Sequence, residues 1–339
     1  MVKIGTIGAG YWGPNVIRNF SRIKSVKLVK CCDKNKKRMA LLKKQYPETK
    51  VTENPRSIFE DGNIDAVYIA TPAESHSRLV KEALLAGKHV LVEKPLATSS
   101  RDAVDLIKTA RKKKKVLMAG HVFEYSPVVN KVKECIRKNI LGKINYIYSS
   151  RTSLGPRARE DVNIVWDYAI HDVSILLYVL NGFPAAVTAT GGTYLRRGIE
   201  DVVFFSMFFP GNILAHCHTS WYDPLKVRKI TFVGNKKMLL YDDLEEKNKI
   251  VVFDRGYTPH RGTDKFGNDG LQLYDGGFKS IASAGKEPLR AECEHFLDCI
   301  LKCKEPRSGG PSAVKVIRVL EAIDKSIKSE GKKIYLRKK

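Results

Sequence analysis

Two side chains that could share a proton, Asp167 and His171, lie four residues apart in the middle of the chain. On a helix, positions four apart share a face, so the carboxylate can orient the imidazole ring and raise its basicity. Such a histidine can take the proton of an alcohol as a hydride leaves the carbon, while a lysine stabilises the developing alkoxide. Lys94, at the end of a predicted strand, is the candidate lysine. The same pattern also fits a helix cap, a core histidine and a solvated loop lysine.

A glycine-rich turn, Gly8-Ala9-Gly10-Tyr11-Trp12-Gly13, follows a predicted strand and opens a predicted helix. In that setting the first glycine permits a tight turn, the second lets the backbone approach a pyrophosphate, and the third lets helix and strand pack closely. Twenty residues beyond Gly13, Asp33 ends the second strand, where a carboxylate accepts hydrogen bonds from ribose hydroxyls and favours NAD over NADP. Basic residues follow at once, Arg38 among them, and they soften the repulsion of a 2′-phosphate, so NADP stays possible.

The elements that must position these residues fall into two patterns. Over the first 120 residues strands and helices alternate, which predicts an α/β domain with a doubly wound parallel sheet. The strands are expected at residues 2–7, 26–32, 66–70, 89–92 and 116–119, and the helices at residues 12–22, 36–45, 75–86 and 101–113. We expect this dinucleotide-binding domain to span residues 1–121.

Residues 122–339 are expected to form a second domain of α+β type, because several strands follow one another through hairpin turns. Its sheet should be large, open and mainly antiparallel. The strands are expected at residues 144–150, 185–190, 202–209, 213–219, 227–233, 237–241, 250–253 and 332–336, and the helices at residues 128–138, 167–180, 289–303 and 312–327. Residues 255–287 are rich in glycine and polar residues and are interpreted as a long loop.

The charge balance is strongly basic, with 60 Lys and Arg against 36 Asp and Glu in 339 residues. Such a surplus is compatible with nucleic acid, an anionic membrane surface or an acidic substrate. The basic residues are spread along the chain, and the densest run, residues 111–115, ends a predicted helix, where cations favour the helix dipole. We therefore expect neither a nucleic-acid nor a membrane partner. No apolar run is long enough to span a bilayer and the first residues lack a secretory pattern, so a cytoplasmic location is expected.

The cysteine pattern fits neither a disulfide framework nor a zinc ribbon, since the seven cysteines include no CxxC pair. His295, Cys299 and Cys303 recur at helical spacing and could align metal ligands. The same predicted helix carries an apolar face, however, and free cysteine commonly behaves as a small buried hydrophobe. We expect no metal site.

Taken together, several motifs resemble the glucose–fructose oxidoreductase and inositol dehydrogenase family, abbreviated Gfo/Idh/MocA. They occur in family order and at family spacing over essentially the whole chain. The motifs are the glycine-rich turn, Thr71-Pro72 with His76, Glu93-Lys94-Pro95-Leu96-Ala97, Gly120-His121 with the Phe-x-Tyr-x-Pro of residues 123–127, and Trp166-Asp167-x-x-x-His171-Asp172.

This resemblance implies a Rossmann domain, followed by a domain whose open sheet makes the contacts of a homodimer or homotetramer. It also implies that Lys94, Asp167 and His171 are catalytic, with His171 as acid and base and Lys94 polarising the reacting oxygen. The residues expected to bind the cofactor, NAD or possibly NADP, are Gly8, Gly10, Tyr11, Trp12, Gly13, Asp33, Arg38, Thr71, Pro72, His76, Glu93, Lys94 and His121.

The substrate is expected to be a sugar, because the chain is similar to the branch of the family that modifies nucleotide sugars. Many family members carry glycines just before the catalytic Asp, whereas residues 161–166 contain none, and Glu124 stands where arginine is common. Arg151, Arg157 and Arg159 precede the catalytic helix, and arginine suits a diphosphate or a carboxylate. These arginines are equally compatible with plain surface charge. The residues expected to bind substrate are Lys94, Tyr125, Arg151, Arg157, Asn163 and His171.

The expected reaction is NAD-dependent oxidation of a ring hydroxyl, at C3, of a UDP-linked N-acetylhexosamine or its uronic acid. Two other readings remain open among NAD-binding proteins: a dehydrogenase of free sugars or inositols, and a catalytically silent regulator. A third, nucleic-acid binding driven by the positive charge, is supported by no dedicated nucleic-acid module in the sequence.

Overall fold

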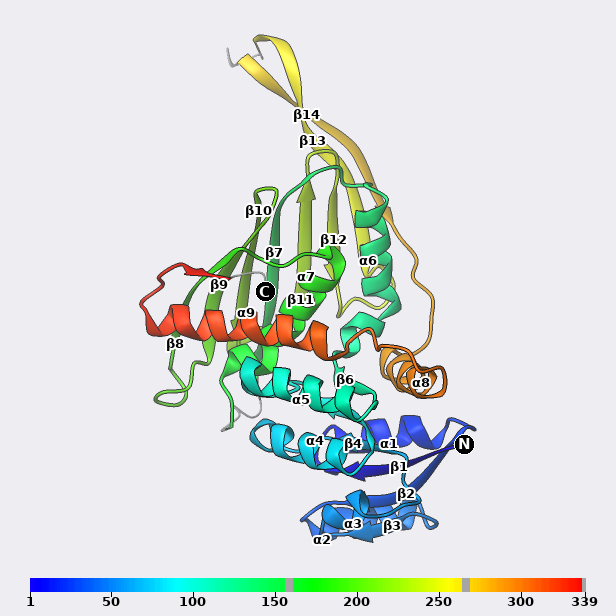
Figure 1. The fold of residues 1–339 in the computed structure, drawn as a ribbon. Helices are drawn as coiled ribbons and strands as arrows, with labels where there is room; N and C mark the ends of the chain where they lie inside the picture. Colours follow the sequence, from blue (N-terminus) through cyan, green and yellow to red (C-terminus); the bar gives the residue numbers. More distant parts are fainter. Residues whose placement is uncertain (156–160, 264–268, 337–339) are drawn as a thin grey trace. The chain divides into compact units, whose positions relative to one another are not determined.

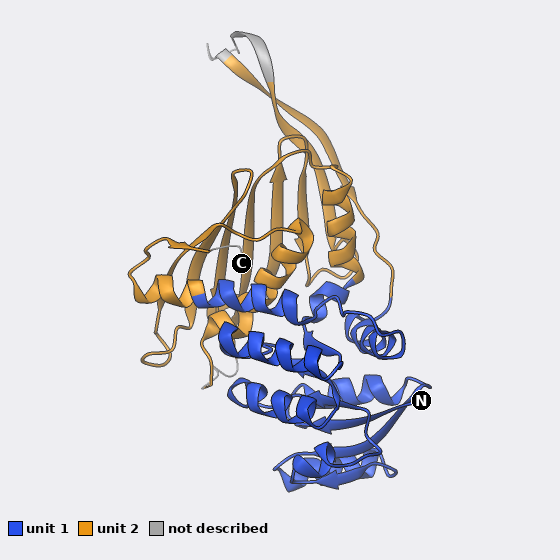
Figure 2. Ribbon diagram, in the orientation of Figure 1, with its two compact units in different colours: residues 1–126, 286–321 blue, residues 127–285, 322–339 orange. Residues whose placement is uncertain are grey.

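The computed structural model describes residues 1–155, 161–263 and 269–336. The chain divides into two compact units, which are coloured separately in Figure 2. Unit 1 consists of Met1–Ser126 with Lys286–Glu321, and unit 2 of Pro127–Gly285 with Ala322–Lys339. In the part of the chain that the structure describes, no helix has the length and apolar character needed to cross a membrane.

Unit 1 is built on a six-stranded, wholly parallel sheet with the strand order β3-β2-β1-β4-β5-β6 (Figure 1). Its strands are β1 (Val2–Ile7), β2 (Val26–Cys32), β3 (Lys50–Thr52), β4 (Ala66–Ile69), β5 (His89–Glu93) and β6 (Leu117–Gly120). This order places a topological switch beside β1, where ligands bind at the carboxyl ends of the strands. The prediction of a doubly wound parallel sheet is confirmed.

The first helices of unit 1 connect its strands, and two further helices come from later in the sequence. They are α1 (Gly13–Ser21), α2 (Lys36–Gln45), α3 (Arg56–Phe59), α4 (His76–Leu85), α5 (Ser100–Lys112), α8 (Pro288–Leu301) and α9 (Gly310–Lys328), whose last turns belong to unit 2, together with the short 3₁₀ turns Ala73–Ser75 and Val122–Tyr125. Asn35 caps α2 by accepting a hydrogen bond from the backbone of Arg38, and Ser99 caps α5 in the same way. The basic run 111–114 lies exposed at the end of α5, as its sequence predicts.

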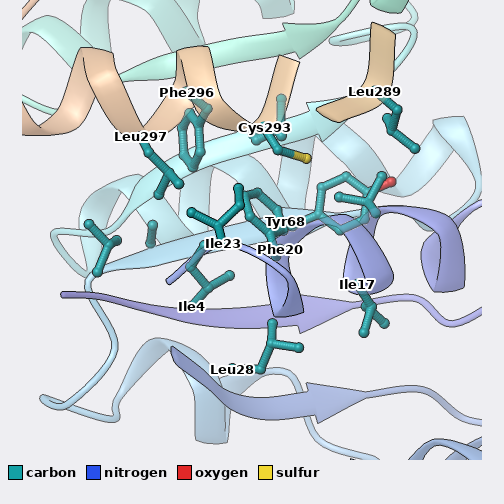
Figure 3. Packing of buried hydrophobic residues seen from close by; sticks show 14 of the residues in the cluster. Ile4, Ile17, Phe20, Ile23, Leu28, Tyr68, Leu289, Cys293, Phe296 and Leu297 are labelled. Atoms are coloured by element: carbon teal, nitrogen blue, oxygen red, sulfur yellow. The ribbon is translucent and has the colours of Figure 1, made fainter. Parts of the chain in front are cut away.

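The core of unit 1 joins the first strands and helices to α8, far along the sequence (Figure 3). Phe20 of α1 packs edge-on against Tyr68 of β4 and against Phe296 of α8, with ring centroids 6.3 and 6.5 Å apart. Ile4 and Ile17 are fully buried in the same cluster. Because α8 contributes to this core, it belongs structurally to the nucleotide-binding sheet rather than to the second sheet.

Unit 2 contains a nine-stranded sheet with the order β14-β13-β12-β11-β7-β10-β9-β8-β15. Its strands are β7 (Ile144–Leu154), β8 (Ala186–Gly192), β9 (Val202–Phe209), β10 (Ile213–Ser220), β11 (Tyr222–Gly234), β12 (Met238–Asp242), β13 (Ile250–Thr263), β14 (Asp269–Ser280) and β15 (Ile334–Tyr335). Among these strands only β7 and β10 pair in parallel, so the expected mainly antiparallel sheet is confirmed.

One face of this sheet is buried and the other is open, as the alternation along β9 shows. Val203, Phe205 and Met207 are buried, whereas Phe204 between them is 43% exposed. The helices of unit 2 are α6 (Pro127–Arg137) and α7 (Ile170–Leu180), and a π-helical turn (Val165–Ala169) leads directly into α7. Most of α7 is buried, as expected for a helix with apolar residues all round.

The interpretation of residues 255–287 as a long loop is wrong, because most of this segment is a β-ribbon. Strands β13 and β14 pair antiparallel from Val251 opposite Ser280 to Thr263 opposite Asp269. Gly256, Gly276 and Gly277, which suggested a loop, occupy positions within these two paired strands. The short elements β3 and α3 were not predicted, because three and four residues are too few to show a periodic apolar pattern.

Candidate active site

The glycine-rich turn in unit 1 has the backbone geometry that its sequence predicts. Gly8 has φ +97°, and a Cβ there would lie 2.3 Å from the carbonyl oxygen of Ala70, which follows β4. At Gly13 a Cβ would lie 2.2 Å from the carbonyl oxygen of Gly8, so α1 reaches β1 only because both residues are glycine. At Gly10, by contrast, the atom nearest to an added Cβ would be Nη1 of Arg38, at 3.8 Å. Gly10 therefore leaves backbone open to a ligand at the start of α1.

Asp33 lies at the end of β2, and its side chain is largely buried against this turn. Its Oδ2 accepts a 2.6 Å hydrogen bond from the backbone N–H of Ala9, and its Oδ1 accepts one of 2.8 Å from Asn35. Arg38 lies 3.8 Å away with half of its side chain exposed, and Tyr11 is 91% exposed. The carboxylate thus connects β2 to the glycine-rich turn.

The loops after β4 and β5 are joined through His76. One nitrogen of its buried ring lies 2.7 Å from the carbonyl oxygen of Pro95, and the other lies 2.8 Å from that of Thr71. Pro95 follows Lys94 through a cis peptide bond. His76 therefore fixes the segment after Lys94 against the segment that begins with Thr71 and Pro72.

Glu93, which precedes Lys94, is held by two aromatic side chains. The hydroxyl of Tyr68 donates a 2.8 Å hydrogen bond to Oε1, and the side chain of Trp12 donates another. Burial raises the pKa of Glu93 to about 7, although these bonds and the charge of Lys94 act in the opposite direction. Trp12, at the turn, is thereby connected to the strand that carries the candidate lysine.

His121 lies buried just beyond the end of β6. Burial, together with the charge of Lys94, lowers its pKa to about 4. The imidazole is therefore neutral at physiological pH and can donate or accept a hydrogen bond without adding positive charge beside Lys94.

These features of unit 1 fit a dinucleotide. Open backbone at Gly10, at the N-terminal end of a nine-residue helix, suits a pyrophosphate, and Asp33 at the end of β2 stands where a ribose would be bound. The residues that would hold NAD are the glycine-rich turn, Asp33 and the strand ends around Thr71 and Lys94.

In unit 2, Asp167 and His171 lie on consecutive turns of different geometry. Asp167 belongs to the π-helical turn Val165–Ala169, and His171 is the second residue of α7. Both side chains are half-buried, and the hydroxyl of Ser174 donates a 2.8 Å hydrogen bond to the carbonyl oxygen of His171. The helix thus begins two residues earlier than predicted, and its first turn is wider. Their convergence with Lys94 stays a prediction.

Three residues expected to bind substrate have partners within their own units. Arg151 is 4% exposed and donates from Nε and Nη2 to Oδ1 of Asp172, at 2.9 and 2.7 Å. The hydroxyl of Tyr125 lies 3.0 Å from that of Ser308 in the core of unit 1. Asn163 caps the turn that carries Asp167. Their roles toward substrate stay predictions, and Arg157 and Arg159 lie outside the described residues.

Sequence reasoning missed two carboxylates beside this turn, Glu200 and Asp324. Both accept hydrogen bonds from the side-chain amide of Asn163, at 2.8 and 3.0 Å. Burial and the charge of Glu200 raise the pKa of Asp324, while hydrogen bonds from Trp166 and Asn163 act against this. The available signal was a pair of acidic residues, Glu321 and Asp324, within the amphipathic helix α9, a pattern too common to be diagnostic.

The side chain of His295, considered above as a metal ligand, takes part in local hydrogen bonds. Its Nε2 accepts a 3.0 Å bond from the backbone of Arg307 and lies 3.4 Å from the sulfur of Cys299. Cys303 is exposed. Within residues 1–155, 161–263 and 269–336, no three His, Cys, Asp or Glu side chains are grouped to hold a metal ion.

Comparison with family models finds two consecutive matches. Residues 2–121 match an oxidoreductase family with an NAD-binding Rossmann fold, and residues 129–240 match the GFO/IDH/MocA C-terminal domain. The two matches together cover more than half of the chain.

Curated relatives and solved structures give a wide range of activities. The chain is 25% identical to myo-inositol 2-dehydrogenase of Thermotoga maritima, over 75% of this chain and 79% of that protein. It is 26% identical to 2,7-anhydro-N-acetylneuraminate hydratase of Mediterraneibacter gnavus, over 62% of this chain and 59% of that protein. Matches to three relatives, this hydratase included, span only 58–60% of their lengths.

Among solved structures, UDP-N-acetylglucosamine 3-dehydrogenase of Acidithiobacillus ferrooxidans superimposes with a TM-score of 0.81 at 22% identity. The match covers 96% of this chain and 97% of that one. At this level of identity, the likeness shows a common fold.

Proposed function

The chain belongs to the Gfo/Idh/MocA oxidoreductase family, and from that premise we propose that it is an NAD-dependent dehydrogenase of a sugar-ring hydroxyl. The proposed substrate is a UDP-linked N-acetylhexosamine or its uronic acid, oxidised at C3. The observation that carries the proposal is the presence, in one chain, of a dinucleotide-binding turn and of Lys94, Asp167 and His171 at family spacing.

The proposed chemistry divides the work among the three side chains. NAD, when bound, supplies the acceptor for the hydride that leaves the substrate carbon. His171 takes the proton of the hydroxyl on that carbon, so that the alcohol loses one hydride and one proton and becomes a ketone. Lys94 stabilises the negative charge that develops on the oxygen, and Asp167 favours the protonated form of His171.

Support for a nucleotide-linked sugar comes from two observations. A protein of the same fold acts on UDP-N-acetylglucosamine, and this chain carries a surplus of basic residues that suits an anionic substrate. Because Arg151 is paired with Asp172, we propose that it stabilises helix α7 rather than binding the diphosphate.

The test begins with a thermal-shift screen of nucleotide sugars, free sugars and inositols in the presence of NAD, since a ligand of the native state raises apparent stability. The stabilising ligands are then assayed for NADH formation. Faster turnover of an inositol or a free sugar than of the nucleotide sugars would contradict the proposed substrate. If no stabilising ligand is turned over, the proposed enzymatic activity is contradicted and the chain is a catalytically silent NAD-binding protein.

Substitution of the catalytic residues tests their roles. Lys94→Ala and His171→Ala should each lower kcat by roughly 10²–10⁴-fold while NAD binding is kept. The matched control is Lys112→Ala on the exposed end of α5, which should not change kcat. Activity retained in either catalytic variant would contradict the assignment.

We further propose that the open face of the nine-stranded sheet packs against a second copy of the chain. This face carries Tyr146, Tyr148, Phe204 and Leu214, each between 40 and 49% exposed, and His216, whose ring stacks on Tyr148. A contiguous apolar patch of this kind is typical of an interface. Sedimentation should show that Tyr148→Glu dissociates the oligomer, whereas Tyr194→Glu, in an exposed loop, does not. A wild-type monomer would contradict the proposal.

A further inference from the structure

The side-chain amide of Asn163 lies between two carboxylates immediately before the turn that carries Asp167. Its Nδ2 donates to Oε2 of Glu200 at 2.8 Å and to Oδ1 of Asp324 at 3.0 Å. Its Oδ1 accepts from the backbone N–H groups of Val165 and Trp166, at 3.1 and 3.4 Å. Both ends of the amide are therefore fully used, the oxygen as a helix cap and the nitrogen as a bridge between acids.

The same two acids hold the residues that follow Asn163. The indole N–H of Trp166 donates to Oδ2 of Asp324 at 2.6 Å, and the backbone N–H of Ile164 donates to the carbonyl oxygen of Glu200 at 3.0 Å. The backbone N–H of Asp167 closes the turn on the carbonyl oxygen of Asn163 at 3.2 Å. Each residue from 164 to 167 therefore donates a hydrogen bond either to Asn163 or to one of the two acids.

Both acids are themselves held by rigid parts of unit 2. Glu200 precedes Asp201, which is 1% exposed and accepts two backbone hydrogen bonds, from Tyr194 and Leu195, at 2.8 and 2.6 Å. Asp324 follows the fully buried Ile323 of α9. Both acids therefore follow or precede residues that are buried in unit 2.

A simple helix cap would not need this arrangement. One acceptor oxygen at residue 163 satisfies the free N–H groups of the first turn, and a hydroxyl or carboxylate side chain provides it equally well. Two carboxylates around one neutral amide instead cost free energy, because like charges face each other in a partly buried place. The turn is also π-helical, a rare geometry that occurs frequently at functional sites.

We propose that Asn163, Glu200 and Asp324, here called the acid clamp, are positioning residues that set the placement of Asp167 and the proton affinity of His171. The inference rests on the proposed function, because it assigns the clamp to the acid and base of that reaction. The acids act through the side chains of Asn163 and Trp166 and through the backbone of Ile164.

The decisive variant is Asn163→Ser, which keeps an oxygen to cap the turn but removes the amide that joins the two acids. We expect kcat to fall about 10–100-fold, with KM for NAD within about twofold of the wild type, because a small misplacement of a catalytic group has effects of this size. Trp166→Phe, which removes the bond to Asp324 and keeps a smaller aromatic ring, should lower kcat less, by about three- to tenfold. The control is Lys325→Ala, exposed on α9 beside Asp324 and expected to be silent.

A second measurement does not depend on turnover. With ¹³C-labelled histidine, the titration of His171 is followed by NMR and assigned by its loss in His171→Gln. The clamp predicts that Asn163→Ser and Trp166→Phe both shift this titration by at least about half a pH unit, whereas Lys325→Ala does not. A change in folding stability alone would leave the midpoint in the folded protein unchanged.

The outcomes separate the inference from the proposed function. If the wild type turns over no sugar, the proposed function fails, and the titration of His171 still decides whether the clamp positions it. If Asn163→Ser matches the wild type in kcat and in the His171 midpoint, Asn163 is only a helix cap and the inference is overturned. Should Asn163→Ser not fold, Trp166→Phe gives the same two readouts, and wild-type values for both would overturn it.

Discussion

Breaking the buried ion pair between Arg151 and Asp172 should destabilise unit 2 strongly. Asp172 follows His171 in the sequence, and the side chains of the pair are 4% and 1% exposed. Arg151→Met leaves the carboxylate of Asp172 buried without its cation, and removal of one partner of such a pair costs about 3–5 kcal/mol. Asp172→Leu removes the carboxylate that accepts two hydrogen bonds from the buried guanidinium of Arg151 and should also destabilise the unit.

The double variant Arg151→Met with Asp172→Leu should recover much of this loss. Both charges are then gone, and replacement of a buried pair by apolar side chains is often neutral. We therefore expect a coupling energy of at least about 2 kcal/mol between the two positions. At roughly 2–4 °C per kcal/mol for a unit of this size, each single variant should lower Tm by about 6–20 °C.

Thermal and urea unfolding followed by circular dichroism measures all four proteins, with NAD affinity as a check on unit 1. The reasoning would be refuted if either single variant lost less than about 1 kcal/mol, or if the double variant lost the sum of the two. A raised KM in Arg151→Met with unchanged stability would instead restore Arg151 as a substrate contact.

Three further predictions concern unit 1. Asp33→Ala should lower the preference for NAD over NADP at least about tenfold in fluorescence titrations, because a carboxylate repels the 2′-phosphate; an unchanged ratio would show that the ribose lies elsewhere. Gly13→Ala should cost roughly 2–3 kcal/mol and abolish NAD binding, since its Cβ would lie 2.2 Å from the Gly8 carbonyl oxygen; calorimetry checks both. The pKa of Glu93 is raised from 4.5 to about 7, so its stabilising contribution is complete below about pH 4.5 and is lost as the pH rises through 7. Glu93→Gln should flatten this fall of about 3 kcal/mol in denaturation curves recorded across that range; a fall of unchanged size would point to another group.

Much of the fold follows from local patterns. Strand β1 and helix α2 begin and end where the sequence predicts, because apolar periodicity and an Asn cap mark their limits. Local patterns do not predict the strands within residues 255–287, because β13 and β14 are paired with each other and show no regular apolar alternation. Pairing of that kind is non-local, and composition does not reveal it.

The candidate site is predictable only in part. The close packing at Gly8 and Gly13 follows from backbone sterics, and the structure shows their close approaches to Ala70 and to one another. The pairing of Arg151 with Asp172 and of Asn163 with Asp324 depends on which side chains tertiary folding brings together. A polar residue near a predicted catalytic helix is equally suited to bind substrate or to hold the helix, and only its neighbours decide between the two.

The position of β7 in the middle of its sheet has a consequence for synthesis. It is the first strand of that sheet to leave the ribosome, yet its two partners, β10 and β11, begin only at Ile213 and Tyr222. At about 5–20 residues per second, the roughly sixty residues between Leu154 and Ile213 take some 3–12 s to translate. Both edges of β7 lack their native partners throughout that interval, so we expect this strand to be a site of chaperone binding on the nascent chain.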